Sequence, residues 1–264
     1  MHIDSIATLL PPVKTAGAIA LKEQSQMVFS DRGFKPDSSI ITKVDPMVES
    51  FLVAEIKSQF PKANILAEEK VRRFDTQKPY TFALDPIDGT DGFSQGMAGW
   101  CISLALLNKN LLPIAGIIFA PKLDMLLFAD VNKPATLNGK AVLFEEQSDP
   151  LSGKSNIMVP SSVHHQLDMS HFPGKIRSIG SAALHLAGPV IYPGVFAGID
   201  GGKGFIWDVA AAHAIVSSVG FDFELLSGKK VSYASMAKGS PVGELILSGP
   251  AGRIVELRAC LKKR

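Results

Sequence analysis

The segment 84–90, Leu-Asp-Pro-Ile-Asp-Gly-Thr, combines residue types that could bind a metal ion and a phosphate. Its two carboxylates, Asp85 and Asp88, lie in a predicted turn stiffened by Pro86, directly after a predicted strand. Mg2+ prefers oxygen ligands, so two carboxylates held this close could bridge two cations. The amides at 89–91, where a helix can begin, could donate hydrogen bonds to a phosphate. The alternative is a plain turn in which both aspartates only cap backbone groups.

Further acidic residues could take part in the same chemistry. Glu68 and Glu69 follow the strand-like run 64–67. Because adjacent carboxylates repel each other, one of them usually faces solvent, and we expect Glu69 to be such a surface residue. Asp208, after Trp207, and Asp45 each stand at the start of a predicted helix. Both could be only helix N-caps, which are common.

Basic residues near these motifs have simpler explanations. The histidines are not arranged at metal-ligand spacing, and His213, on an apolar helix, is expected to be a satisfied core or interface residue. Lys35 could reach a phosphate, but a loop lysine is more often solvated. We therefore expect Lys35 to point into solvent.

Helices and strands must bring these distant positions together. Helices are predicted over 3–30, split or restarted at Pro11-Pro12, and over 45–59. Strands are then predicted over 80–84, 101–107, 111–119 and 125–129, followed by a hairpin at Asn138-Gly139. Beyond residue 155, strands are predicted over 156–159, 176–179, 190–199 and 221–226, and helices over 181–187 and 208–219.

This order of elements predicts a layered α+β and α/β sandwich, with an antiparallel sheet and helices followed by a smaller α/β half. The polar stretch 145–154 is typical of a connection between subdomains. We therefore expect an N-terminal α+β subdomain at 1–150 that carries most of the metal ligands. A C-terminal α/β subdomain at 151–264 would carry Asp208 and the substrate-pocket segments.

Composition excludes several classes of function. The 264 residues are 46% hydrophobic and 20% charged, with a formal charge of +2, which is ordinary for a globular protein and does not call for a nucleic acid polymer or a membrane as a partner. No apolar run approaches the ~20 residues of a membrane-spanning helix. Two cysteines form no disulfide framework, and the N-terminus lacks the features of a signal peptide. These features predict a cytoplasmic protein.

Taken together, the acidic motifs resemble those of the inositol monophosphatase superfamily, which includes fructose-1,6-bisphosphatases and 3′-phosphoadenosine bisphosphate nucleotidases. The resemblance rests on the order and rough spacing of Asp45, Glu68-Glu69, the 85–90 motif and Trp207-Asp208-Val209-Ala210-Ala211. It extends over nearly the whole chain. The hairpin 137–140 and the segment 177–183, which is similar to one that lines the family's substrate pocket, also match.

The resemblance implies a phosphatase that hydrolyses a small phosphate monoester with a metal-activated water. It implies these metal ligands: Glu68, Asp85, the Ile87 carbonyl, Asp88 and Asp208. Glu68 with Thr90 would orient and deprotonate the water, and Asp45 would act through waters on a third, weaker ion. The resemblance implies phosphate or substrate contacts from Asp88, Gly89, Thr90, Gly180, Ser181 and Asp208.

The same resemblance implies the cofactors and the assembly. Two to three Mg2+ ions would bind, with Mn2+ as a substitute and with Li+ and Ca2+ as inhibitors. Lithium would hold the product phosphate in place of a divalent ion and give uncompetitive inhibition. A homodimer is expected.

The substrate is less well indicated than the reaction. The resemblance places Gly201 at the position where inositol monophosphatases have a glutamate that binds ring hydroxyls. Asp200 could compensate for the missing glutamate by a loop shift. Lys203 could instead meet a second phosphate or an acidic group. The segments 178–181 and Ala212-His213 look closer to the nucleotidase branch. A 3′(2′),5′-bisphosphate nucleotidase or a sugar bisphosphatase is therefore the alternative.

Two competing classes are considered. Haloacid dehalogenase phosphatases also have an aspartate and a Gly-Thr after a strand, but one residue separates their two aspartates. Here two residues separate Asp85 from Asp88, and Pro86 follows the first, so no nucleophile stands at the required place. The other class is a regulatory protein that keeps the fold without turnover. All ligand positions are filled here, which argues against lost catalysis.

Overall fold

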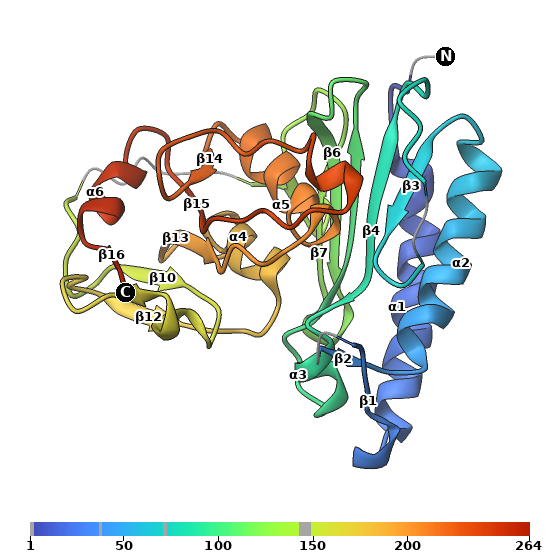
Figure 1. Ribbon diagram of the computed structural model, residues 1–264, viewed down its shortest axis with the longest axis horizontal. Coiled ribbons are helices and arrows are strands. Elements are labelled where there is room, and N and C mark those ends of the chain that lie inside the picture. The colour runs from blue at the N-terminus through green and yellow to red at the C-terminus, as the bar shows by residue number, and fades with distance from the viewer. Residues whose placement is uncertain (1–2, 37–38, 71–72, 143–148) are drawn as a thin grey trace.

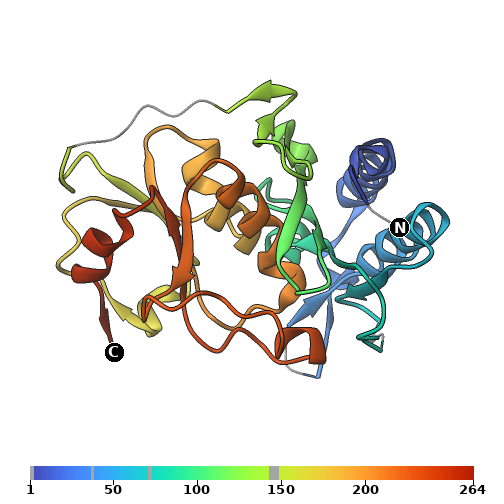
Figure 2. The same ribbon diagram turned by 90° about the horizontal axis from the view of Figure 1, so that it is seen from above.

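Helices and sheets alternate in layers along the long axis of the computed structural model, which describes residues 3–36, 39–70, 73–142 and 149–264 (Figure 1). A helix pair, a large sheet, a second helix pair and a smaller sheet follow one another, with α6 (Ile254–Ala259) on the outer side of the smaller sheet. The view from above shows the same order (Figure 2). The predicted layered architecture of mixed α and β elements is confirmed.

The large sheet has seven strands in chain order, and all neighbours are antiparallel except β3 and β4. Its strands are β3 (Asn64–Ala67), β4 (Thr81–Asp88), β5 (Cys101–Leu107), β6 (Pro113–Ala120), β7 (Met125–Ala129), β8 (Thr136–Leu137) and β9 (Lys140–Ala141). The predicted strands 64–67, 101–107 and 125–129 are confirmed at both ends. The Asn138-Gly139 hairpin is confirmed too, and both residues have positive φ, as a type I′ turn requires.

Helices cover both faces of this sheet. The pair α1 (Leu10–Gln26) and α2 (Val44–Gln59) packs on one face, and the pair α4 (Ala182–Ile191) and α5 (Ile206–Ser218) packs on the other. Strand side chains alternate between faces. On β4, Phe82 and Leu84 therefore pack with α1 and α2, whereas Ala83 packs with α5.

Small residues let α5 approach the sheet closely. A Cβ atom on Gly116 of β6 would lie 2.6 Å from the Ala211 carbonyl oxygen, which is closer than real Cβ contacts allow. Neighbouring positions on the sheet and on the helix are also small, as at Ala105 of β5 and Ala212 of α5. This close approach sets the position of the first turn of α5 relative to β4.

The smaller sheet mixes parallel and antiparallel pairs in the order β12-β10-β13-β15-β14. Its strands are β10 (Asn156–Met158), β12 (Lys175–Arg177), β13 (Val195–Asp200), β14 (Asp222–Leu225) and β15 (Ile246–Gly249). The remaining short elements are η1 (Ala7–Leu9), η2 (Phe29–Asp31), β1 (Gly33–Phe34), β2 (Ile40–Ile41), α3 (Thr90–Ser94), η3 (Pro121–Leu123), η4 (Val163–His165), β11 (Leu167–Asp168), η5 (Met236–Lys238) and β16 (Lys262–Lys263).

Several predicted elements differ in extent from the structure. The predicted strand 190–199 begins only at Val195, because α4 continues to Ile191. Residues 183–191 are buried and almost all apolar, so periodicity could not separate helix from strand there. The helix predicted over 3–30 is split or restarted at Pro11-Pro12 as expected, because η1 ends at Leu9 and α1 begins at Leu10 with the prolines in its first turn, where proline costs no hydrogen bond. α1 ends at Gln26, earlier than predicted.

The predicted connection 145–154 lies partly outside the described residues, and the subdomain boundary near residue 150 stays a prediction. Within the described ranges, no helix has the length and apolar character needed to cross a bilayer.

Candidate metal centre

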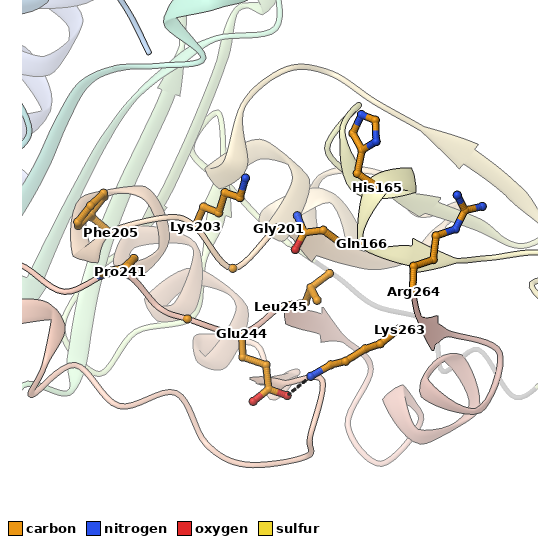
Figure 3. A pocket seen from close by; sticks show the side chains of 12 residues that line it. His165, Gln166, Gly201, Lys203, Phe205, Pro241, Glu244, Leu245, Lys263 and Arg264 are labelled. Atoms are coloured by element: carbon orange, nitrogen blue, oxygen red, sulfur yellow. Dashed lines mark ion pairs between the residues drawn. The ribbon is translucent and has the colours of Figure 1, made fainter. Parts of the chain in front are cut away.

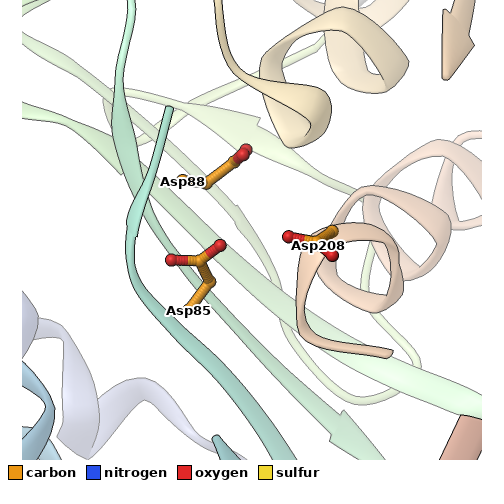
Figure 4. A group of neighbouring side chains, drawn as sticks. All are labelled: Asp85, Asp88 and Asp208. Carbon is orange, nitrogen blue, oxygen red and sulfur yellow. The ribbon is translucent and has the colours of Figure 1, made fainter. Parts of the chain in front are cut away.

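Three buried or half-buried carboxylates converge between the large sheet and α5. Asp85 and Asp88 come from β4, and Asp208 comes from the first turn of α5. One carboxylate oxygen from each residue lies within 4.8 Å of the others, and the side chains point toward one another (Figure 4). The structure thus brings together three of the predicted ligands, although 120 positions separate Asp88 from Asp208.

A bulge in β4 presents both of its aspartates to this space. The strand was predicted to end at Leu84, but it continues to Asp88, and its register against β5 shifts between Asp85 and Asp88. Pro86 lacks an N–H, so it fits a bulge, where no ladder bond is lost. Within the bulge, the Ile87 N–H donates to Oδ1 of Asp85 at 2.9 Å. The predicted turn is therefore a distortion inside a strand.

Asp88 is held from the opposite side by the start of α4. Its carboxylate accepts hydrogen bonds from Ser181 Oγ at 2.5 Å, from the Ala182 N–H at 3.1 Å and from the Ala183 N–H at 2.7 Å. Burial nevertheless raises the pKa of Asp88 to about 6, against the lowering effect of these donors. Ser181, a predicted substrate contact, thus bonds a predicted metal ligand directly.

Asp208 is the third residue of α5 rather than its N-cap. Its Oδ2 accepts a hydrogen bond from the Phe205 N–H, which precedes the helix. Burial, together with the charges of Glu68 and Asp88, raises the pKa of Asp208 well above its ordinary value. The predicted helix start at 208 was two residues late, and one carboxylate oxygen of Asp208 lies in the cluster.

Glu68 and Glu69 are placed differently from what we expected. The Glu69 side chain is only 4% exposed, and its Oε1 pairs with Lys35 Nζ at 2.8 Å. The predicted surface position of Glu69 and the predicted solvated state of Lys35 are both wrong, because Lys35 also reaches Oε1 of Glu68 at 2.8 Å. Burial lowers the pKa of Lys35, but the charges of the two glutamates outweigh it and raise this pKa overall.

Glu68 lies next to the three aspartates, but it is not one of the residues whose carboxylate oxygens all lie within 4.8 Å of one another. Its charge, after burial itself, raises the pKa of Asp85 well above the ordinary value. Its Oε2 is buried and has no hydrogen-bond partner among the described residues. This oxygen is therefore free to accept a further ligand or proton.

Asp45 and Thr90 are directly connected. Thr90 Oγ1 lies 3.0 Å from Oδ1 of Asp45 and 2.9 Å from the Ile87 carbonyl oxygen. Asp45 is fully buried inside α2, which begins one residue earlier than predicted, so it is not an N-cap. Its Oδ2 instead accepts hydrogen bonds from the N–H and the hydroxyl of Thr42.

Gly89 and Gly180 let two loops meet beside Asp88. Both have positive φ, +97° and +102°, and a Cβ on Gly89 would lie 3.0 Å from the Gly180 carbonyl oxygen. Side chains at these positions would be strained and crowded. Their predicted roles as phosphate or substrate contacts stay predictions, as do the predicted roles of the other site residues.

Sequence reasoning missed His185, which holds the loop at Ile179 and Gly180 beside the site. It is 2% exposed, and its Nε2 accepts hydrogen bonds from the N–H groups of Ile179 and Gly180 at 3.0 and 3.3 Å. Burial lowers the pKa of His185 to about 4, so the ring stays neutral and can accept. Ser181 caps α4, because its Oγ accepts a hydrogen bond from the Leu184 N–H. A histidine four residues after such a capping serine was the only available signal in the sequence. His213, as expected, is satisfied, bonding the Tyr233 hydroxyl at 2.9 Å.

The cluster fits a hard divalent cation. In the described part of the chain, no lysine or arginine lies within ion-pair distance of Asp85, Asp88 or Asp208. Burial without a counter-charge strongly favours the protonated form of a carboxyl group, and the pKa values of all three are raised. A cation with a preference for oxygen ligands would relieve this cost, and Mg2+ is such an ion.

Comparison with known proteins gives a consistent result. A model of the inositol monophosphatase family matches residues 6–256. A fructose-1,6-bisphosphatase/inositol-1-monophosphatase of Thermotoga maritima is 29% identical over 208 residues, which are 76% of this chain and 75% of the relative. A 3′(2′),5′-bisphosphate nucleotidase of Buchnera aphidicola is 25% identical over 252 residues, covering 90% of this chain and 89% of the relative.

Solved structures agree in fold. An IMPase of Thermotoga maritima superposes with a TM-score of 0.79 at 23% identity, covering 95% of this chain and 93% of that one. The extragenic suppressor protein suhB of Bartonella henselae has a TM-score of 0.79 at 20% identity, covering 96% of both chains. At these identities the likeness shows the fold alone, and it supports the layered architecture described above.

Proposed function

Because the chain belongs to the inositol monophosphatase family, we propose that it is a Mg2+-dependent phosphatase that hydrolyses a small phosphate monoester. The observation that supports this proposal most is the convergence of the Asp85, Asp88 and Asp208 carboxylates within 4.8 Å, with no cation from the described chain beside them. Such a cluster is costly to bury unless a metal ion binds it.

The ligands of two Mg2+ ions would be Glu68, Asp85, the Ile87 carbonyl, Asp88 and Asp208, and Asp45 would act on a third ion through waters. When bound, the ions supply Lewis-acid chemistry, which lowers the pKa of a water and neutralises charge on the phosphoryl and leaving oxygens. The protein itself fixes the ligands, since Asp88 and Asp208 are each held by hydrogen bonds to backbone N–H groups.

Thr90 and Glu68 would orient the attacking water. Thr90 Oγ1 points its hydrogen at Asp45 or at the Ile87 carbonyl, so its lone pairs remain available to accept a hydrogen from the water. The buried Oε2 of Glu68 has no partner in the described residues and could take the proton. Gly89, Thr90, Gly180 and Ser181 would form the phosphate side of the site.

Phosphate release from a panel of esters tests the proposal. The panel comprises inositol 1-phosphate, fructose 1,6-bisphosphate, 3′-phosphoadenosine 5′-phosphate, histidinol phosphate and glycerol phosphates. Release that depends on Mg2+ and stops with EDTA is expected for at least one ester. No release from any member with Mg2+ or Mn2+ would point to a regulatory protein that keeps the fold without turnover.

Isotope labelling tests the direct attack of water. In 18O-water, one turnover should place a solvent oxygen in the phosphate, and no acid-stable phosphoenzyme should be trapped. An aspartyl-phosphate would contradict the mechanism and favour chemistry of the haloacid dehalogenase type. Two residues, Pro86 and Ile87, stand between Asp85 and Asp88, whereas that class requires a single residue between its two aspartates.

The remaining features of the proposal can each be measured separately. Mn2+ should substitute for Mg2+, and Ca2+ should bind without supporting turnover because it tolerates looser geometry. Lithium should inhibit uncompetitively with respect to substrate, and Asp208→Asn should shift that sensitivity. We also propose a homodimer and a cytoplasmic location, which light scattering and cell fractionation would test.

A further inference from the structure

The carboxylate cluster is supported from two sides by different means. The Phe205 N–H bonds Asp208 from one side, and the donors at the start of α4 bond Asp88 from the other. The segment 201–205 forms the first support, and the loop 179–181 leads into the second. What fixes each support therefore decides how firmly the carboxylates are placed.

Backbone contacts fix the first support. The segment 201–205 forms one wall of a basic cavity of about 600 Å³, whose other walls are the segments 165–166, 241–245 and 263–264 (Figure 3). Its cationic side chains are Lys203, Lys263 and Arg264. The Val242 and Gly243 N–H groups donate to the Gly204 and Gly202 carbonyl oxygens, each at 2.9 Å. These bonds join two walls of the cavity through the main chain, so the first support is held without a side chain.

A histidine ring fixes the second support. The N–H groups of Ile179 and Gly180 donate to Nε2 of His185 at 3.0 and 3.3 Å. His185 is the fourth residue of α4, and helix side chains lean toward the N-terminus, so its ring reaches the chain that enters the helix. It thus accepts two N–H groups that precede the Ser181 cap, where a helix supplies no acceptor of its own.

The loop that the ring holds is in close contact with the surroundings of the cluster. A Cβ on Gly99 would overlap the Ile179 carbonyl oxygen, and one on Gly89 would lie 3.0 Å from the Gly180 carbonyl oxygen. The next residue, Ser181, donates to Asp88. A shift of this loop would therefore disturb the donors to Asp88 together with the predicted phosphate contacts.

The ring must be neutral to act as this acceptor. Because Nε2 accepts from two N–H donors, the ring proton lies on Nδ1. Burial lowers the pKa of His185 to about 4, which keeps the ring uncharged at neutral pH. Nδ1 is buried and has no hydrogen-bond partner among the described residues, so the two amides alone select this tautomer. A carboxylate at position 185 could accept the same N–H groups, but it would add a negative charge near Asp88.

We propose that His185 is a positioning residue of the site: its neutral ring, as the Nδ1–H tautomer, fixes the loop 179–180 and thereby the donors that hold Asp88 and the predicted phosphate contacts Gly180 and Ser181. The inference rests on the proposed function. It adds a residue that belongs to none of the acidic motifs. Loss of the Nε2 acceptor should weaken the binding of both Mg2+ and phosphate, although His185 is not proposed to contact either.

Nitrogen NMR of the full chain with 15N-labelled histidine tests the tautomer without turnover. Between pH 8 and pH 6, Nε2 of His185 should resonate as an unprotonated nitrogen and Nδ1 as a protonated one. The signals are assigned by their loss in His185→Gln. A proton on Nε2, or a ring that becomes charged above pH 6, would overturn the inference.

A pair of substitutions separates the acceptor from the bulk of the ring. His185→Gln keeps a neutral acceptor at a similar distance from the backbone, and His185→Leu removes it. In His185→Leu the Mg2+ affinity, measured by calorimetry, should fall about tenfold. The KM should rise about tenfold, while kcat at saturating Mg2+ should change by less than about threefold. His185→Gln should stay within about threefold of the wild type in Mg2+ affinity and KM.

The matched control is His213→Leu, which makes the same change on α5 at a histidine that bonds the Tyr233 hydroxyl. Both leucine variants should lower Tm, but only His185→Leu should change Mg2+ affinity and KM. Equal Mg2+ affinity and KM in His185→Leu and the wild type, or a His185→Gln variant as weak as His185→Leu, would overturn the inference. If His185→Leu does not fold, the tautomer in the wild type decides.

Failure of the proposed function would give a different pattern. If no ester is hydrolysed, the tautomer and the Mg2+ affinities still test the role of His185. If esters are hydrolysed but the ring carries its proton on Nε2 and His185→Leu binds Mg2+ normally, the inference is removed and the phosphatase remains.

Discussion

The carboxylate cluster and the basic cavity, on either side of the segment 201–205, manage charge in opposite ways. The cluster buries Asp85 and Asp88 with no lysine or arginine from the described chain beside them. The cavity leaves Lys203 and Lys263 in solvent, where an unpaired charge costs little. The charges of the first region repel one another when no cation is bound, whereas those of the second face water. Changes in the cluster should therefore alter kcat and stability, whereas changes in the charges of the cavity should alter stability little.

The largest effect is expected from Asp85→Asn. Asp85 is fully buried, and burial followed by the charges of Glu68, Asp88 and Asp208 raises its pKa. The neutral amide would remove one of the proposed metal ligands, so kcat at saturating Mg2+ should fall by about 10³-fold or more. The metal-free protein should become more stable by about 1–3 kcal/mol, because a repelling charge is gone. Steady-state kinetics and denaturant melts measure both.

The control for this prediction is Asp149→Asn, which makes the same chemical change on the surface. It should alter neither kcat nor stability. If Asp85→Asn keeps wild-type activity, the assignment of Asp85 to metal binding is wrong. Lower stability of the metal-free variant would show that the cluster is not strained by repulsion.

Next in size is the stabilisation by Mg2+ and its pH dependence. Mg2+ at about 100 times its Kd should stabilise the folded state by ~2.7 kcal/mol and raise Tm by roughly 5–10 °C. Asp88 has a folded pKa of about 6, above its unfolded value. Its contribution to metal-free stability is therefore present at low pH and is lost as the pH rises through about 6. Protons and Mg2+ compete for the same carboxylates.

The difference in Tm between Mg2+ and EDTA should therefore be largest near pH 8 and shrink below about pH 6. His185 and His213 have pKa values lowered to about 4, so they destabilise the fold as the pH falls. The two histidines lower the stability equally with and without metal, so their effects cancel in the Tm difference between Mg2+ and EDTA. A Tm difference that stays constant from pH 8 to pH 5.5 would contradict a carboxylate site.

A smaller effect is expected where the cluster is anchored to α4. Ser181→Ala removes a hydrogen bond to Asp88 and the acceptor for the Leu184 N–H. Loss of the cap should cost about 1 kcal/mol of stability, and the loosened Asp88 should weaken Mg2+ affinity about tenfold. Ser235→Ala, at an exposed serine without a side-chain cap bond, is the control. Unchanged Mg2+ affinity would mean that the amides of Ala182 and Ala183 suffice.

The smallest effect concerns Lys35, which gives Glu68 and Glu69 the cation that the aspartates lack. Because Lys35 Nζ bonds Oε1 of Glu68, it competes with a metal ion for this carboxylate. Lys35→Gln should lower the Mg2+ midpoint two- to threefold, by about 0.5 kcal/mol, and reduce metal-free stability by about 1 kcal/mol. Lys43→Gln removes an exposed ion pair with Glu23 and serves as the control. A raised Mg2+ midpoint would mean that Lys35 organises the site.

Features set by neighbouring residues could be predicted from the sequence. The Asn138-Gly139 hairpin and strand 101–107 follow from local turn chemistry and alternation. The nearness of Asp85 and Asp88 is also local. The fold and the set of predicted metal ligands were inferred from the family resemblance. Composition alone could not show that these distant motifs lie together in space.

Pairings across long sequence separations could not be predicted. Lys35 and Glu69 are 34 positions apart, and Ser181 and Asp88 are 93 apart. A sequence shows that a residue could bond, but the partner depends on how loops and layers are stacked. Asp45 illustrates the same point, because its burial in α2 against Thr90 turned a plausible N-cap into an interior acceptor.

Gly116 gives the cluster a genetic vulnerability at a distance from it. A methyl group there would press on the Ala211 backbone oxygen, and a helix cannot yield at one carbonyl without shifting as a unit. The displaced unit carries Asp208. In a survey of random variants, Gly116→Ala should therefore lower activity in the same way as substitutions of the predicted metal ligands. It would do so although it changes no charge and lies on a strand that supplies none of these ligands. At Gly116, tolerance to mutation therefore depends on the rigidity of α5 rather than on distance from the carboxylate cluster.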